Sequence, residues 1–164
     1  VVKLALYKGP PTDWAHKIAH WAVCIFTGSS YSHCELVIGG VCWSASARDG
    51  APGHSNGVRG KVIDLTSGRW DVIDLPAYLD EAAALAWFKD HEGAPYDWAG
   101  VFRFGLPFLP LSLRRWFCSE ACAAALSAAG AVLPKAAHDY TPQSLAEIGA
   151  VVRNFRKGIK PAGL

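Results

Sequence analysis

The feature that most constrains this sequence is a pair of short apolar stretches on either side of two adjacent glycines. Residues 31–38 (Tyr-Ser-His-Cys-Glu-Leu-Val-Ile) and residues 41–46 (Val-Cys-Trp-Ser-Ala-Ser) flank Gly39-Gly40. A tight hairpin turn needs positive φ angles, which glycine adopts without a steric penalty. We therefore predict a β-hairpin here and, with it, a mainly antiparallel sheet.

Apolar spacing and turn residues predict the remaining elements. The pattern indicates strands at 2–8, 61–65, 70–75 and 151–155, the middle two forming a second hairpin, and helices from Thr12 or Asp13 to Gly28, at 76–91, at 118–129 and, briefly, after Thr141. Residues 47–60 are dominated by turn formers and are predicted to be a surface loop. Residues 100–116 are apolar but contain glycine and proline, which suits a loop packed against a groove. These elements predict an α+β fold in which an antiparallel sheet packs against helices.

The composition indicates one globular domain over residues 1–164, with a basic tail at 156–164. Apolar residues make up 51% of the chain and charged residues 18%, which excludes a disordered protein. The net charge is only +2, so we expect no nucleic-acid partner. Charged residues interrupt every long apolar stretch, so no membrane span is predicted. The first residues show no secretion signal, and a cytoplasmic or virion-associated location fits this expectation.

The cysteines and histidines do not form the usual metal-binding patterns. The five cysteines contain no CxxC pair and are predicted to be reduced thiols. His16 and His20 lie four residues apart without a third ligand cluster, so we expect neither a metal nor a cofactor. Cys118 begins a predicted helix, a position that lowers the pKa of a thiol and offers backbone amides to an oxyanion. Cys122, one helical turn further on, is expected to be buried and inert.

The best candidate for a base is His33, on the first strand of the predicted hairpin. Strand alternation places Cys34, Leu36 and Ile38 on the core face and Tyr31, His33, Glu35 and Val37 on the other face. Glu35 lies about 7 Å along the strand from His33 and could orient its imidazole. A thiol nucleophile needs a base held in the correct tautomer, so this face is predicted to carry the site.

Four segments together resemble the motifs of a known family. They are Tyr31–Ile38, Gly93–Trp98, Phe117–Glu120 and Tyr140–Leu145, and they are similar to successive motifs of the circularly permuted papain-like cysteine hydrolases, the permuted NlpC-type group. In that group the histidine precedes the cysteine, as His33 precedes Cys118 here. Within that group the sequence resembles the small bacterial and phage-borne members more than the others.

The resemblance implies roles for individual residues. Cys118 matches the nucleophile of the family and His33 its general base. Family members often place an acid on the strand after the histidine strand, where this chain has Cys42–Ser46, so we assign the third role to Glu35. We predict that Tyr31, Arg48 and Ser119 contact the substrate.

These roles predict a thiol-dependent hydrolase that cleaves amide bonds. The resemblance implies cell-wall peptides of peptidoglycan as the substrate. Two alternatives stay open: an acyltransferase or lipid or thioester hydrolase of the same fold, and a phage or envelope module that binds without turnover.

Overall fold

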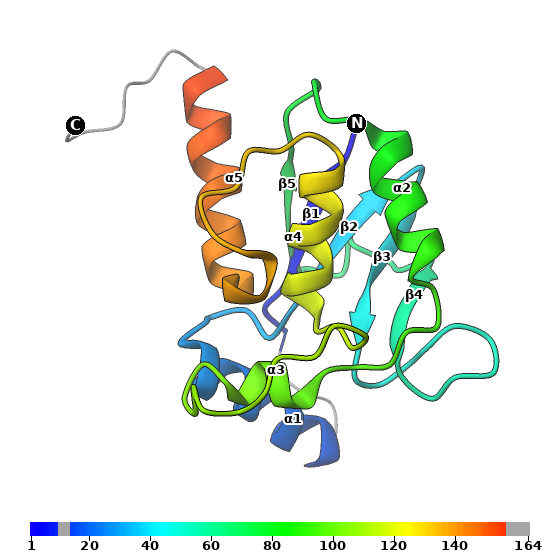
Figure 1. Ribbon diagram of the computed structural model, residues 1–164. Coiled ribbons are helices and arrows are strands. Elements are labelled where there is room, and N and C mark those ends of the chain that lie inside the picture. The colour runs from blue at the N-terminus through cyan, green and yellow to red at the C-terminus, as the bar shows by residue number, and fades with distance from the viewer. Residues whose placement is uncertain (10–13, 157–164) are drawn as a thin grey trace.

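A five-stranded antiparallel sheet forms the centre of the computed structural model, which describes residues 1–9 and 14–156 (Figure 1). The strand order is β4-β3-β2-β1-β5. The strands are β1 (Lys3–Tyr7), β2 (His33–Ile38), β3 (Val41–Ser46), β4 (Gly57–Lys61) and β5 (Trp70–Asp74). This arrangement confirms the predicted mixture of α and β structure and the antiparallel sheet.

Helices pack on the sheet and at one end of it (Figure 1). α4 packs against β2, β3 and α2, α5 contacts β5 and β1, and α1 contacts α3. The bounds are α1 (Trp14–Thr27), α2 (Glu81–Asp90), α3 (Trp98–Phe102), α4 (Cys118–Ala128), the short 3-10 helix η1 (Ala137–Asp139) and α5 (Pro142–Arg156). No helix within residues 1–9 and 14–156 has the length and apolar character needed to cross a bilayer.

The predicted β2–β3 hairpin is confirmed. Leu36 pairs with Trp43, and the turn residues Gly39 and Gly40 have φ angles of 57° and 82°. The alternation along β2 is confirmed as well, because Cys34 contacts Cys122 of α4 while its neighbours in sequence point to the opposite face of the sheet.

The predicted second hairpin is wrong. β4 occupies 57–61 and pairs with β3 at one edge of the sheet, whereas β5 pairs with β1 at the other edge. The predicted loop therefore ends at residue 56. The glycines that suggested a turn instead let a strand approach its neighbours closely: a Cβ on Gly60 would lie 2.7 Å from the Trp43 ring.

Three other predictions need correction or lie outside the described residues. Residues 151–155 belong to α5 rather than to a strand, because the helix that starts at Pro142 continues past Gly149, which packs against Ile73. Residues 100–102 are helical, and Phe108 and Leu113 of the following segment are 78% and 91% exposed rather than packed in a groove. The expected caps at 12 and 13 and the tail at 157–164 lie outside the described residues.

The close approach of β4 to residues 94–95 can be tested at Gly57. Its φ is 114°, and an added Cβ would lie 2.0 Å from the Ala94 carbonyl oxygen. We expect Gly57→Ala to lower the free energy of unfolding by more than about 2 kcal/mol, since a backbone clash adds to the positive-φ penalty. Gly53→Ala, also at positive φ but with open space around its Cβ position, should lose only about 1–2 kcal/mol. Urea unfolding measures both, and equal losses would contradict the clash.

Candidate active site

The structure brings together the three residues predicted to be catalytic. His33 is the first residue of β2 and Cys118 the first residue of α4. The His33 Nε2 lies 2.8 Å from the Glu35 Oε1, and the His33 side chain also interacts with the Cys118 thiol. The imidazole thus has a carboxylate as its hydrogen-bond partner and a thiol near enough to interact with it, a combination that can activate a thiol nucleophile.

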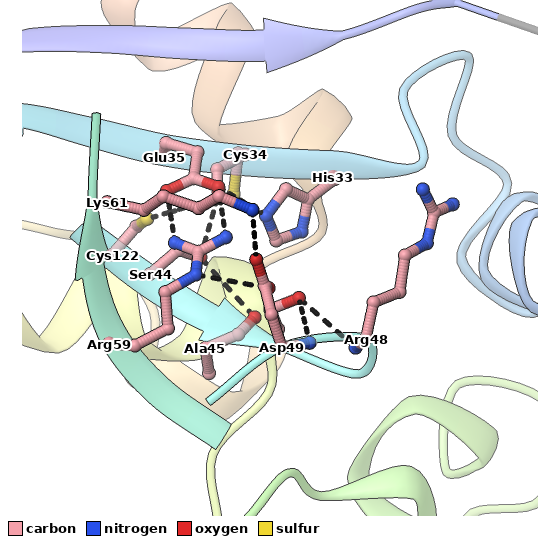
Figure 2. Close-up of polar contacts among 11 residues, drawn as sticks. His33, Cys34, Glu35, Ser44, Ala45, Arg48, Asp49, Arg59, Lys61 and Cys122 are labelled. Carbon is pink, nitrogen blue, oxygen red and sulfur yellow. Dashed lines mark hydrogen bonds and ion pairs between the residues drawn. The ribbon is translucent and has the colours of Figure 1, made fainter. Parts of the chain in front are cut away.

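Glu35 is held by a chain of charged side chains on the same face of the sheet (Figure 2). Its side chain is fully buried, and the Arg59 Nη1 and Nη2 donate to its two oxygens at 2.7 and 2.8 Å. The Arg59 Nε donates to Asp49 at 3.2 Å, and Lys61 donates to Asp49 at 2.8 Å. A buried carboxylate with these partners has a fixed position and a fixed charge.

The charges around His33 set its protonation. Burial alone would lower the pKa of the imidazole, but the Glu35 carboxylate and the Cys118 thiol raise it to about 10. Burial would likewise raise the pKa of Glu35, and its interactions with His33 and Arg59 lower that pKa instead. His33 is therefore an imidazolium and Glu35 a carboxylate near neutral pH.

The Cys118 sulfur is correspondingly acidic. A hydrogen bond with the Cys34 side chain lowers its pKa, burial opposes this effect, and the neighbouring His33 reinforces it, so that the pKa lies well below its ordinary value. The first amides of α4 have no carbonyl partner within the helix, so they can stabilise negative charge at this end. Both shifts favour the thiolate–imidazolium form of the Cys118–His33 pair.

The site also contains a cluster of thiols. The Cys34 and Cys122 sulfurs lie 3.8 Å apart, and Cys122 is buried as predicted. The five cysteines are free. Strand alternation correctly placed Cys34 in the core, but its contact with Cys118 could not be read from the sequence because it depends on how α4 lies on β2.

A cavity of about 350 Å³ opens beside His33. His33 and Glu35 line it together with residues of α1, of the 46–49 turn and of the 96–98 segment. The His33 side chain is 22% exposed. Cys118 is 2% exposed and does not line the cavity, so the cavity presents the imidazole, rather than the sulfur, to solvent.

The three predicted substrate contacts lie in different surroundings. Arg48 is exposed on the cavity wall, and its guanidinium has no hydrogen bond or ion pair within the described part of the chain. The Tyr31 hydroxyl donates to Asp71 at 2.9 Å, away from the cavity lining. The Ser119 hydroxyl is buried and donates to the Tyr140 carbonyl at 2.6 Å. The cavity wall therefore contains Arg48 but neither Tyr31 nor Ser119.

No metal site accompanies these residues. Within residues 1–9 and 14–156, no group of three or more histidine, cysteine, aspartate or glutamate side chains could hold a metal ion. His16 belongs to the part of α1 whose side chains are not described.

The sequence analysis missed Arg59. It lay within the predicted surface loop, whereas the structure buries it at 4% exposure in β4. Its register opposite Ser44 places it on the Glu35 face of the sheet. The glycines around it concealed the strand, so the sequence offered no signal that paired this arginine with Glu35.

A second buried carboxyl group lies in the first turn of α4. Burial raises the pKa of Glu120, and the charge of Asp97 adds to this rise, so that the pKa reaches about 8 even though a Phe117 backbone hydrogen bond favours ionisation. The Phe117 amide donates to the Glu120 Oε2 at 3.4 Å. Glu120 is therefore mainly uncharged at neutral pH.

Comparison with known proteins adds no assignment: no family model and no curated protein matches this chain.

The charged chain behind Glu35 can be tested by removing its two cations separately. Arg59→Met leaves a buried carboxylate without its bidentate partner, and we expect the free energy of unfolding to fall by about 3–5 kcal/mol. Lys61→Met is the matched control, because Lys61 is 57% exposed and an exposed pair contributes about 1 kcal/mol or less. Chemical denaturation measures both variants. Similar small losses in the two variants would show that the ion pair between Glu35 and Arg59 contributes little to the free energy of unfolding.

Proposed function

We propose that this protein is a cysteine hydrolase of the permuted papain-like, NlpC-type group, acting on amide bonds. Cys118 would be the nucleophile, His33 the proton carrier and Glu35 the residue that orients His33. The observation that carries the proposal is the His33 imidazole that is hydrogen-bonded to the buried, ionised Glu35 and interacts with the Cys118 thiol. The four motif resemblances and the order of histidine before cysteine support it.

The reaction has two steps. The Cys118 thiolate attacks the carbonyl carbon and forms a C–S bond, while the first amides of α4 stabilise the oxyanion. The His33 imidazolium gives its proton to the leaving nitrogen as the C–N bond breaks. A water molecule then gives a proton to His33 and attacks the thioester, and the C–S bond breaks to release the carboxylic acid and the thiolate.

The proposed substrate is a peptide of the bacterial cell wall. Arg48 supports it, because an exposed guanidinium on the cavity wall can bind a substrate carboxylate in a bidentate manner. Peptidoglycan stem peptides carry such carboxylates. The resemblance to bacterial and phage-borne hydrolases points to the same class of substrate.

One observation favours a second candidate, an acyltransferase or a lipid or thioester hydrolase. Residues 105–113 carry several exposed apolar side chains and follow directly after α3, whose Trp98 lines the cavity. An acyl chain could lie on such a surface. The covalent chemistry at Cys118 would be the same for this substrate.

Thiol alkylation tests whether the pair is active. With iodoacetamide and mass mapping at neutral pH, we expect Cys118 to react faster than Cys122, because its lowered pKa increases the fraction of Cys118 present as thiolate. His33→Ala removes one of the groups that lower the Cys118 pKa, so this pKa rises and the alkylation rate of Cys118 at neutral pH should fall toward that of Cys122. His54→Ala, which removes an exposed histidine, is the control. Equal, slow alkylation of Cys118 and Cys122 would support the module that binds without turnover.

Product analysis tests the bond and the substrate. Purified peptidoglycan and acyl lipids are incubated separately with the protein and with Cys118→Ser, and the products are identified by mass spectrometry. We expect new peptide fragments from peptidoglycan with the unaltered protein alone. Arg48→Ala should raise KM about tenfold or more with little change in kcat, the signature of lost substrate binding. Release of fatty acid instead would favour the second candidate, and release of neither product would contradict both.

A further inference from the structure

Exposed apolar side chains gather at the end of the molecule formed by α1 and the segment after α3. Leu113 is 91% exposed, Phe108 78% and Trp21 61%. Burying side chains of this size is normally favourable, and a cluster of exposed ones marks an interaction surface. We name this surface the α1–loop face, made up of Trp21, Ile25, Leu106, Phe108, Leu111 and Leu113.

The two parts of the α1–loop face are joined by packing. The Phe26 and Phe102 rings meet edge to face with centroids 5.0 Å apart, and the position of a Cβ on Gly105 would lie 2.7 Å from the Phe26 ring. Figure 1 shows the chain after α3 running beside α1 at one end of the molecule. α1 and the loop therefore lie side by side at this end of the molecule.

The charged side chains of the two segments that carry the α1–loop face are basic. Arg114 and Arg115 directly follow its last apolar residue and are exposed, and neither forms an ion pair with another described residue. The sequence contains no aspartate or glutamate at 14–34 or at 98–116. Apolar and aromatic residues bordered by unpaired arginines are typical of proteins that lie on an anionic bilayer.

We propose that the α1–loop face docks on the surface of a bilayer that contains anionic lipids. The apolar side chains enter the boundary between headgroups and acyl chains, and Arg114 and Arg115 bind lipid phosphates. A second copy of the chain is a poorer occupant, because a twofold contact would bring the same arginines together, and neither segment of the face contains an acidic residue to pair with them. The inference does not depend on catalysis.

Docking would also determine how the cavity is placed relative to the bilayer. His20 and Val23 of α1 line the cavity, as does Trp98 of α3, so the helices that border the α1–loop face also border the site. A bilayer bound there would lie next to the helices that line the cavity. The substrate would then be one presented at a membrane surface.

Vesicle sedimentation of the full chain tests the docking. We expect binding to vesicles of phosphatidylcholine with phosphatidylglycerol, little binding to phosphatidylcholine alone, and weaker binding at high salt. Phe108→Ser/Leu113→Ser should weaken binding at least about tenfold, since two apolar side chains no longer leave water. Arg114→Gln/Arg115→Gln should abolish the preference for the anionic vesicles. The control is Tyr78→Ser/Val132→Ser, which removes exposed apolar side chains elsewhere and should bind normally.

Other results would overturn the proposal. Failure to sediment with anionic vesicles would do so, as would equal loss of binding in the Tyr78→Ser/Val132→Ser control. A concentration-dependent dimer that Phe108→Ser/Leu113→Ser abolishes would assign the face to a second copy of the chain instead. Cys118→Ser should bind vesicles as the unaltered protein does, so a failure of the proposed catalysis and a failure of docking can be told apart.

Discussion

The burial of one carboxylate determines how the rest of the site is arranged. Glu35 has no exposed surface, and an ionised group in such a place is destabilising unless it is paired and hydrogen-bonded. Arg59 and His33 supply these partners from two different strands. The same carboxylate keeps His33 protonated, and His33 adds to the Cys34 hydrogen bond in keeping the Cys118 pKa low. The ionisation of the Cys118 sulfur thus depends in part on Glu35, which lies on the opposite face of β2 from Cys34.

Much of the fold could be predicted from local patterns. The Gly39-Gly40 turn and the alternation of β2 gave the central hairpin, and the same alternation put His33 and Glu35 on one face. The start of α4 at Cys118 agreed with the structure. These features are set by backbone conformation and by side-chain periodicity within a few residues, so a sequence contains enough information to predict them.

The features of the fold and the site that were not predicted depend on contacts between segments that are distant in the sequence. The edge strand β4 was hidden because its glycines satisfy a packing requirement against Trp43 and Ala94 that no local pattern reveals. Because β4 was not predicted, Arg59, the main partner of Glu35, was missed as well. A hydroxyl such as that of Ser119 looked available to a ligand until the fold supplied the Tyr140 carbonyl as its acceptor. In each of these three cases the structure depends on pairing between distant residues, about which local sequence propensity carries little information.

The uncharged state of Glu120 has a consequence for the nucleophile. A carboxylate in the first turn of a helix interacts favourably with the positive end of the helix dipole, and would share that potential with any other anion nearby. Because burial and Asp97 keep Glu120 protonated up to about pH 8, the sulfur at the head of α4 has no anionic competitor in its own turn. Near neutral pH, the positive end of the α4 dipole therefore acts mainly on the Cys118 sulfur. Above about pH 8, Glu120 ionises and adds a second negative charge in the same turn.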